Sequence, residues 1–406
     1  MFRLNGMFSI GILFTFCILL SIWYGAVVLE QNVVLRDFYE IPKLWFPVFF
    51  FTMGYETRFT QRRLSRLIYA YGFAILLICI YAWGQWIGLP ITQTLNGFYS
   101  AGVHDEALYL TKRVYSTMGN PNVLGLLLSW AVVCFTLNLL AKQGNRIWNG
   151  MFLLSAVVTI AMTASRSSVL MAATGLVLVL VLSFSGPSFS NRKRVKQFCL
   201  VLAFLPIVAL VAFQVVQTNP HAISRYEELK HPGQVDSLRE RIDDLWLDAL
   251  ADFGRSPLVG FGPAKVRFAG IVTDSEYLDV LKQFGLVGFA VYISFFLYPL
   301  YFLWKGVRAA KKVPLPFEPQ LRSDILVVRF TFITLILALL INIGAATFYS
   351  LFLQGFLWLW FGIGVGSART VCETVGIISL QASLVSRSGP SVFGPELDEL
   401  QFPSAT

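Results

Sequence analysis

The sequence predicts an all-α integral membrane protein, a polytopic bundle of about ten transmembrane helices with one long polar loop on the outer side. Of its 406 residues, 56% are hydrophobic and only 14% are charged, and the apolar residues form runs long enough to cross a bilayer. Lys and Arg gather in short loops that alternate with loops poorer in positive charge. The net charge of +9 therefore reflects topology, and no nucleic-acid partner is predicted.

Most of the predicted spans approach the roughly 18 to 20 residues that cross the hydrocarbon core. They are residues 6–29, 67–89, 123–140, 148–164, 169–185, 198–217, 284–304, 325–343 and 348–366. A further segment, 44–55, is short and contains Pro47, so it is either a tilted span or a re-entrant piece. The first segment has an apolar stretch too long for a signal peptide and no clear small-residue cleavage site, and we interpret it as a span.

The basic loops set the predicted orientation, because positive loops stay in the cytoplasm. These loops lie at residues 58–66, 142–146, 192–196 and 305–312. If segment 44–55 is counted as a span, both termini are cytoplasmic, and the long loop 218–278 lies outside. We expect one transmembrane domain, residues 1–368, which includes this loop. The Ser-, Gly- and Pro-rich residues 369–406 are expected to form a largely disordered cytoplasmic tail.

The long outer loop has its own predicted structure. Residues 237–240 (Ser-Leu-Arg-Glu) form a capping-box pattern, and apolar residues then recur at helical spacing until Gly254, which predicts an amphipathic helix. Two prolines and two glycines within residues 257–263 predict turns. Residues 273–276 (Thr-Asp-Ser-Glu) form a second capping-box pattern, which predicts a helix that leads into the next span.

Three arginines of the outer side are candidates for binding. Arg166 lies in a tight turn between two spans, where it either snorkels to lipid headgroups or binds an anionic group at the membrane surface. Arg239 and Arg241 flank the apolar stripe of the loop helix. Helix-surface ion pairs with Asp243 and Asp244 would explain these two arginines, and so would contact with a substrate.

Asp274 and Glu276 lie where the long loop re-enters the membrane. Carboxylates in a first helical turn are favoured by the helix dipole, and the alternative is a group that orients or deprotonates an acceptor hydroxyl. Residues 120–122, which follow Arg113, have turn chemistry that caps the next span. The histidines lack paired spacing and no cysteine lies in the long loop, so no metal site, cofactor or disulfide is predicted.

The motifs follow one another along the outer loops in a specific order. They are Arg113 with Gly-Asn-Pro-Asn at 119–122, Ser-Arg at 165–166, Arg241 with Trp246, Ser-Pro-Leu-Val-Gly-Phe-Gly at 256–262, Asp-Ser-Glu-Tyr-Leu at 274–278 and Gly-Leu-Val-Gly at 285–288. In this order they resemble the O-antigen ligase and O-antigen polymerase family of bacterial envelope glycosyltransferases. Each motif is weak alone, but their order on these loops is considerably more specific.

The resemblance implies a glycosyltransferase C-like bundle in the bacterial inner membrane, with loop 218–278 and the active site in the periplasm. It implies transfer of a glycan from a polyprenyl diphosphate. The implied substrate-binding residues, which would hold the pyrophosphate, are Arg166 and Arg241, assisted by Arg239 and Arg113; the implied catalytic residues are Asp274 and Glu276. Fixed arginines can stabilise the charge that develops on a leaving diphosphate without a metal ion.

The re-entry motif separates two activities of this family. Ligases usually carry His-Asn where this chain has Asp274 and Ser275, so we favour polymerisation of lipid-linked repeat units into O-antigen or exopolysaccharide. One alternative is a ligase that transfers the glycan to lipid A core or protein. Another is a transporter or flippase of the same lipid, although the charges lie mostly at span ends. Expected partners are the lipid-linked glycan, membrane lipid, a chain-length regulator and a flippase protein.

Overall fold

The computed structural model describes residues 6–57, 59–99, 112–184, 217, 223, 239, 241–268, 273–313, 319–345 and 351–387. Every regular element within these residues is a helix, which confirms the all-α prediction. The long helices are α1 (Gly6–Val27), α2 (Glu40–Glu56), α3 (Gln61–Trp86), α6 (Pro121–Leu140), α7 (Arg146–Met162), α8 (Arg166–Phe184), α13 (Glu276–Ala310), α14 (Pro319–Ile341) and α15 (Leu351–Arg387). The short elements are α4 (Pro90–Tyr99), α12 (Leu247–Arg255), the 3₁₀ turns η1 (Leu35–Tyr39) and η2 (Ser116–Met118), and the π-helical turn η5 (Arg241–Trp246).

Seven of the described helices are long and apolar enough to cross a membrane, namely α1, α3, α6, α8, α13, α14 and α15. Helix α7 is also apolar and has 17 residues. The short candidate at 44–55 lies within α2, a 17-residue helix that contains Pro47. The predicted span at 198–217 lies, except for its last residue, outside the described residues. The protein is thus a multi-pass helical bundle.

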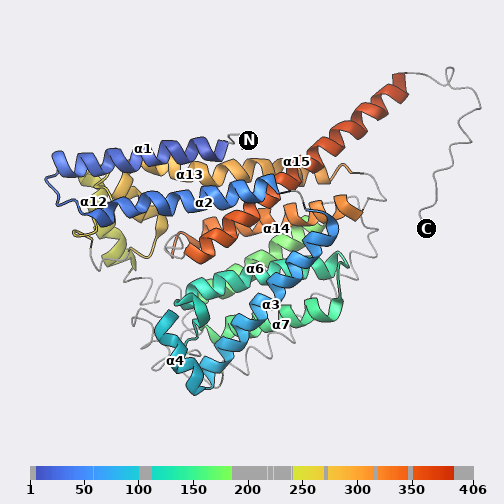
Figure 1. Ribbon diagram of the computed structural model, residues 1–406, viewed down its shortest axis with the longest axis horizontal. Helices are drawn as coiled ribbons and strands as arrows, with labels where there is room; N and C mark the ends of the chain where they lie inside the picture. The colour runs from blue at the N-terminus through green and yellow to red at the C-terminus, as the bar shows by residue number, and fades with distance from the viewer. Residues whose placement is uncertain are drawn as a thin grey trace, which may run out of the picture.

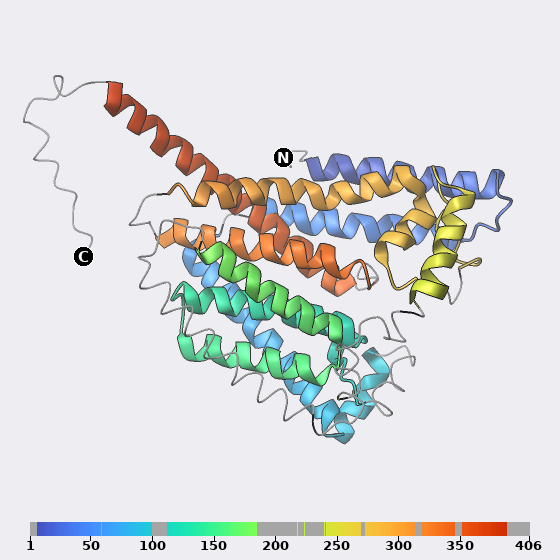
Figure 2. The ribbon, with the colours of Figure 1, turned by 180° about the vertical axis from the view of Figure 1, so that it is seen from behind.

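The bundle has two groups of helices with α14 between them (Figures 1 and 2). Helices α1, α2, α13 and α15 pack on one side of α14, and α3, α6, α7 and α8 pack on the other. Helices α2 and α15 approach backbone to backbone, because a Cβ at Gly54 or Gly362 would collide with the main chain of the facing helix. The elements η1, α4 and α12 lie at one end of the bundle, hereafter the outer end (Figure 1).

The last helix corrects part of the predicted tail. Helix α15 continues to Arg387 and projects from the bundle (Figure 1), so residues 369–387 are helical. Val371 is buried in a small apolar cluster with Val313 and Ile325, which anchors this stretch. Arg369 also pairs with Glu373 one turn on, at 2.7 Å, and such pairs support a helix. The remaining residues of the predicted tail, 388–406, lie outside the described residues.

The outer-loop helix is present, but its geometry differs from the prediction. The π-helical turn η5 precedes α12, which ends at Arg255, one residue after the predicted stop at Gly254. The second predicted capping box is wrong, because Ser275 rather than Thr273 is the N-cap of α13. The Ser275 side chain makes no capping hydrogen bond. Thr273 instead contacts a buried ion pair, described below, which leaves its hydroxyl unable to cap the helix.

Helix α13 is broken at Gly285, whose φ of 63° and ψ of −168° are accessible essentially only to glycine. The break exposes backbone groups that a continuous helix would pair internally. The loop of residues 257–262 pairs with them. The N–H groups of Phe261 and Gly262 donate to the carbonyls of Lys282 and Gln283, and the carbonyls of residues 257 and 258 accept from the N–H groups of residues 286 and 287. The turn-rich loop is therefore fixed to the membrane bundle.

Candidate functional site

Arg241 and Asp274 form an ion pair at the outer end. Arg241 Nε lies 3.1 Å from Asp274 Oδ2, and the two side chains are 27% and 39% exposed. The same guanidinium lies beside the turn after α14, since a Cβ added to Gly344 would lie 3.8 Å from Arg241 Nη1. Asp274 has a φ of 51°, which is uncommon for a residue with a side chain. The pair joins the loop helix to the re-entry motif.

Arg239 and Arg241 have different kinds of partner. Arg239 Nε lies 3.4 Å from Asp243, and both side chains are more than half exposed. This is the helix-surface ion pair that the spacing predicts. The predicted ion pair of Arg241 with Asp244 is wrong, because the Arg241 side chain forms an ion pair with Asp274 instead. The turn η5 is π-helical, so side chains three residues apart no longer stack as they would on an α-helix.

Arg113 lies against the turn between α7 and α8. Its Nε donates to the Thr163 carbonyl at 3.1 Å, and its Nη2 donates to Asn122 Oδ1 at 3.5 Å. Ser165 Oγ donates to the same amide oxygen at 2.8 Å. The structure therefore brings three of the sequence motifs together: Arg113, the Asn-Pro-Asn turn and the Ser-Arg pair that contains Arg166.

Arg166 is the first residue of α8 and is partly exposed. Ser165 acts as the N-cap, because its Oγ accepts from the Ser168 N–H at 3.3 Å and its carbonyl accepts from the Val169 N–H at 3.2 Å. The helix dipole disfavours a cation in the first turn and favours an anion there. An anion bound at this helix start would contact the guanidinium and offset that unfavourable interaction.

Glu276 has surroundings unlike those of Asp274. It is buried, and its N–H donates to the Asn342 carbonyl at 3.0 Å. Together with Asp279, it borders a cavity of about 40 Å³ between α1, α2 and α13 that Glu40 and Lys43 also line. Of the two predicted catalytic carboxylates, only Asp274 is therefore substantially exposed.

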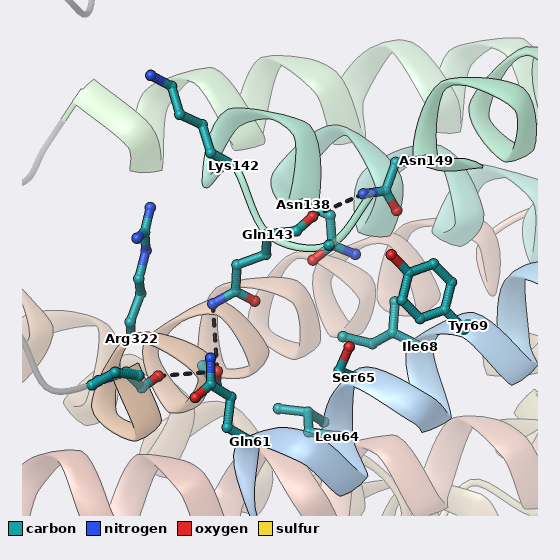
Figure 3. Close-up of a pocket in the computed structure, with 13 residues that line it drawn as sticks. Gln61, Leu64, Ser65, Ile68, Tyr69, Asn138, Lys142, Gln143, Asn149 and Arg322 are labelled. Atoms are coloured by element: carbon teal, nitrogen blue, oxygen red, sulfur yellow. Dashed lines mark hydrogen bonds between the residues drawn. The ribbon is translucent and has the colours of Figure 1, made fainter. Parts of the chain in front are cut away.

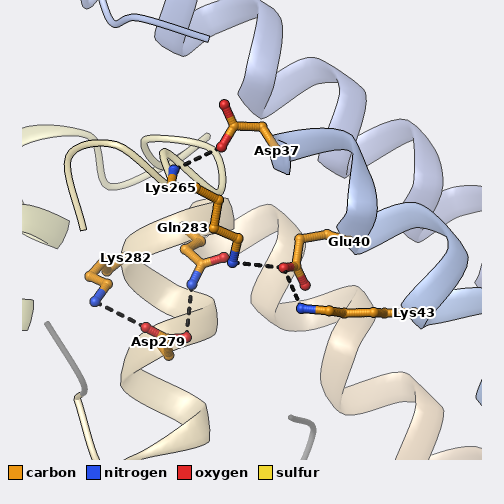
Figure 4. Close-up of polar contacts among 7 residues, drawn as sticks. All are labelled: Asp37, Glu40, Lys43, Lys265, Asp279, Lys282 and Gln283. Atoms are coloured by element: carbon orange, nitrogen blue, oxygen red, sulfur yellow. Dashed lines mark hydrogen bonds and ion pairs between the residues drawn. The ribbon is translucent and has the colours of Figure 1, made fainter. Parts of the chain in front are cut away.

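Asp279 is the centre of a buried polar network that the sequence interpretation missed (Figure 4). Its Oδ1 lies 3.0 Å from Lys282 Nζ and accepts from Thr273 Oγ1 at 3.1 Å, and its Oδ2 accepts from Gln283 Nε2 at 2.8 Å. Lys282 Nζ also donates to Thr273 at 2.8 Å and lies 4.4 Å from the centre of the Phe268 ring. An opposite-charge pair three residues apart inside an apolar helix was the available signal.

A second polar cluster joins the loop to the start of α2 (Figure 4). Glu40 lies 2.7 Å from Lys265 Nζ and 2.9 Å from Lys43 Nζ. Asp37 is buried and accepts from the backbone N–H groups of Lys265 and Val34, at 2.7 and 2.8 Å. These contacts fix the part of the loop around Lys265 to η1 and to the start of α2.

The predicted site residues thus form two groups at the outer end. Arg113 and Arg166 lie at the start of α6 and α8, whereas Arg241, Asp274 and Glu276 lie around the start of α13. Helix α14 packs against both α8 and α13. A substrate that contacts Arg166 and Arg241 together would therefore extend across the outer end of α14.

A comparison with known protein families bears on both groups. A family model described as O-antigen ligase matches residues 150–293. This part of the chain is similar to the O-antigen ligase family. The matched segment includes Arg166, Arg241, Asp274 and the loop of residues 257–262, which pairs with the backbone at the break of α13. The match supports assignment to the O-antigen ligase and polymerase family. No curated protein matches the chain in a search by sequence.

The O-antigen ligase assignment supports a membrane glycosyltransferase-like enzyme that acts on a lipid-linked glycan. Within the described residues, no group of three or more His, Cys, Asp or Glu side chains is placed to hold a metal ion. The three histidines of the chain, His104, His221 and His231, lie outside the described residues.

Proposed function

We propose that this protein polymerises polyprenyl-diphosphate-linked oligosaccharide repeat units into O-antigen or exopolysaccharide at the periplasmic face of the bacterial inner membrane. The observation that carries the proposal is the half-buried Arg241–Asp274 pair, which lies at the outer end and inside the O-antigen ligase match. It offers a cation for a diphosphate and a carboxylate for an acceptor hydroxyl at one place.

In the proposed reaction, an acceptor hydroxyl of one repeat unit attacks the anomeric carbon of the sugar at the end of another lipid-linked chain. The bond between this carbon and the diphosphate oxygen breaks, and the polyprenyl diphosphate leaves with the electron pair. Asp274 takes the hydroxyl proton. Arg241 and Arg166 stabilise the negative charge that grows on the diphosphate, and such fixed charges are worth most where water is excluded.

The other two arginines have supporting roles in this proposal. Arg113 is a positioning residue, since its bonds to Thr163 and Asn122 orient the turn that carries Arg166. Arg239 is exposed and paired with Asp243, so its contribution is to the local positive potential rather than to direct contact with the reacting atoms.

The second candidate is a ligase that transfers the finished glycan to lipid A core or to protein, and the description of the matched family favours it. Products distinguish the two activities. Cells without a polymerase would carry single repeat units on the envelope, whereas cells without a ligase would accumulate long chains on the carrier lipid. A transporter of the same lipid would make no new glycosidic bond.

The test uses purified full-length protein and polyprenyl-diphosphate-linked repeat units, with chain growth followed by gel electrophoresis. Arg166→Ala and Arg241→Ala are expected to slow growth by about 10² or more, the cost of losing one stabilising group from a transition state. Arg255→Ala is the matched control, because Arg255 is an exposed arginine at the far end of α12. Unchanged growth in both variants would refute the arginine roles, and no growth with the parent protein would refute polymerisation.

A further inference from the structure

A cavity of about 370 Å³ lies beside the start of α3 (Figure 3), at the end of the bundle opposite the outer end (Figure 1). The start of α3, the end of α6, the start of α7 and the start of α14 enclose it. Its volume falls within the range of small-ligand sites. No role in the proposed transfer reaction requires a cavity here, because the arginines and Asp274 lie at the other end.

The residues that line this cavity carry mostly neutral hydrogen-bonding groups, and two cations lie at its rim. The neutral groups are the amides and hydroxyls of Gln61, Ser65, Tyr69, Asn138, Gln143 and Ser323. The cations are Lys142 and Arg322, and both are exposed. Figure 3 shows these two side chains on the same side of the cavity. Amides and hydroxyls suit a ligand with hydroxyl groups, and the two cations suit a phosphate.

Asn138 gives the cavity an unmet hydrogen-bonding requirement. The residue is 2% exposed and borders the cavity, and its Oδ1 accepts no hydrogen bond from the described residues. Among the described residues, the Asn138 Nδ2 makes only a weak contact, with Cys134 Sγ at 3.8 Å. A buried amide oxygen without a donor is costly, so a ligand hydroxyl that donates to it gains affinity. A phosphate without hydroxyls could not supply that donor.

The turn between α6 and α7 is fixed in the shape that forms this cavity. Lys142 and Gly144 both have positive φ, at 53° and 68°. Asn149 Nδ2 donates to the Gln143 carbonyl at 2.9 Å, and the Asn145 N–H donates to Tyr69 Oη at 2.5 Å. The wall is thus held by hydrogen bonds before any ligand arrives, which lowers the cost of binding.

The first turn of α7, next to the cavity, has the character of a membrane interface. Ile147 is 81% exposed and Trp148 is 39% exposed, and tryptophan is enriched at the level of lipid headgroups. Exposed Arg62, Arg63 and Arg66 on the first turns of α3 add to the positive potential of this end. Such basic regions attract anionic lipids of the cytoplasmic leaflet.

We propose that this cavity binds a glycerol phosphate group, supplied by the headgroup of an anionic phospholipid of the inner leaflet. Lys142 and Arg322 contact the phosphate, and a glycerol hydroxyl donates to Asn138 Oδ1. The acyl chains lie over Ile147 and Trp148. The site is separate from the outer arginines, so it is a lipid-binding site whichever reaction the outer end carries out.

The experiment measures the thermal stability of delipidated full-length protein in a neutral detergent during titration with three ligands. These are short-chain phosphatidylglycerol, phosphatidylcholine of the same chain length and soluble glycerol phosphate. Phosphatidylglycerol is expected to raise the melting temperature and phosphatidylcholine is not. Binding of glycerol phosphate as tight as that of the lipid would keep the site and assign it to a soluble ligand. An equal response to phosphatidylcholine would overturn the proposal.

Variants locate the binding. The Lys142→Gln, Arg322→Gln double variant should weaken phosphatidylglycerol binding about tenfold or more, as expected for lost charge-assisted contacts. The matched control, Lys311→Gln with Lys312→Gln, removes the same charge from an exposed turn of the same end and should leave binding unchanged. Asn138→Leu should raise the melting temperature without ligand and reduce the ligand-induced shift. Equal weakening in the control and the cavity variant would overturn the proposal.

Discussion

The ion pair of Lys282 and Asp279 predicts an unequal response to the loss of either partner. Both residues are buried, with 1% and 7% of their surfaces exposed, and their charged atoms are 3.0 Å apart. At an effective dielectric constant of about 20, the attraction between the charges at this distance of 3.0 Å is about 5.5 kcal/mol. Desolvation of both groups offsets much of it, so the net effect depends on what each charge keeps when its partner is removed.

Lys282→Met leaves the Asp279 carboxylate buried without a cation, and we expect a loss of about 3–5 kcal/mol in the free energy of unfolding. Asp279→Asn should cost less, because the lysine keeps its hydrogen bond to Thr273 and its contact with the Phe268 ring. The double variant should be more stable than Lys282→Met alone, since its asparagine can still accept from Thr273 and carries no charge.

The measurement is reversible unfolding of the purified protein in mixed micelles, analysed as a double-mutant cycle. The exposed pair of Arg369 and Glu373, 2.7 Å apart, serves as the matched control. Its coupling should be only about 0.3–0.5 kcal/mol, as for other exposed helix pairs. A double variant that is no more stable than Lys282→Met would refute the argument, because the buried charge would then not be the cause of the loss.

Three further predictions concern the outer end. Gly285→Ala should lower the free energy of unfolding by about 1–3 kcal/mol from backbone strain alone, and a collision with the Leu258 backbone adds to this loss. The control Gly150→Ala, at an open position of α7, should be nearly neutral or stabilising. Equal unfolding curves for the two variants would contradict this prediction. Asp37→Asn should cost about 1.5–3 kcal/mol in the same assay, because two backbone N–H groups lose a charged acceptor, and an unchanged unfolding curve would count against the contact. In a double-mutant cycle of unfolding, the partly exposed Arg241–Asp274 pair should show a coupling free energy below about 1 kcal/mol, so the Arg241→Ala variant should remain folded. A coupling free energy several times larger would mean that the pair serves stability rather than function.

The sequence was sufficient for the helices whose signal is continuous. The apolar runs predict α1, α6 and α14 because each needs only length and composition to be recognised. Helix termini were harder. The pattern Thr-Asp-Ser-Glu suits a capping box at Thr273, but the structure begins α13 at Glu276, because Thr273 is committed to the buried lysine and aspartate. A tertiary contact overrode a local preference.

The candidate site was predicted in its residue types and not in its contacts. Arg241 and Asp274 are 33 residues apart, and their ion pair depends on a π-helical turn and on a positive φ at an aspartate, neither of which has a sequence signature. The motifs at 257–262 and 285–288 were recognised separately. The spacing of the residues does not predict the backbone hydrogen bonds between these two motifs. The break at Gly285 lies inside an apolar run, and such a run predicts a continuous helix.

The docking of these two glycine motifs bears on which carboxylate can act. Backbone bonds at the break fix the start of α13 relative to the loop, and Asp37 and Glu40 hold the other flank of that loop. Glu276 is thereby buried beside α1 and α2, where an acceptor sugar has no room in a cavity of about 40 Å³. Asp274 precedes the helix and stays exposed beside Arg241. Because proton transfer requires contact with the acceptor hydroxyl, the fold favours Asp274 over Glu276 for that role.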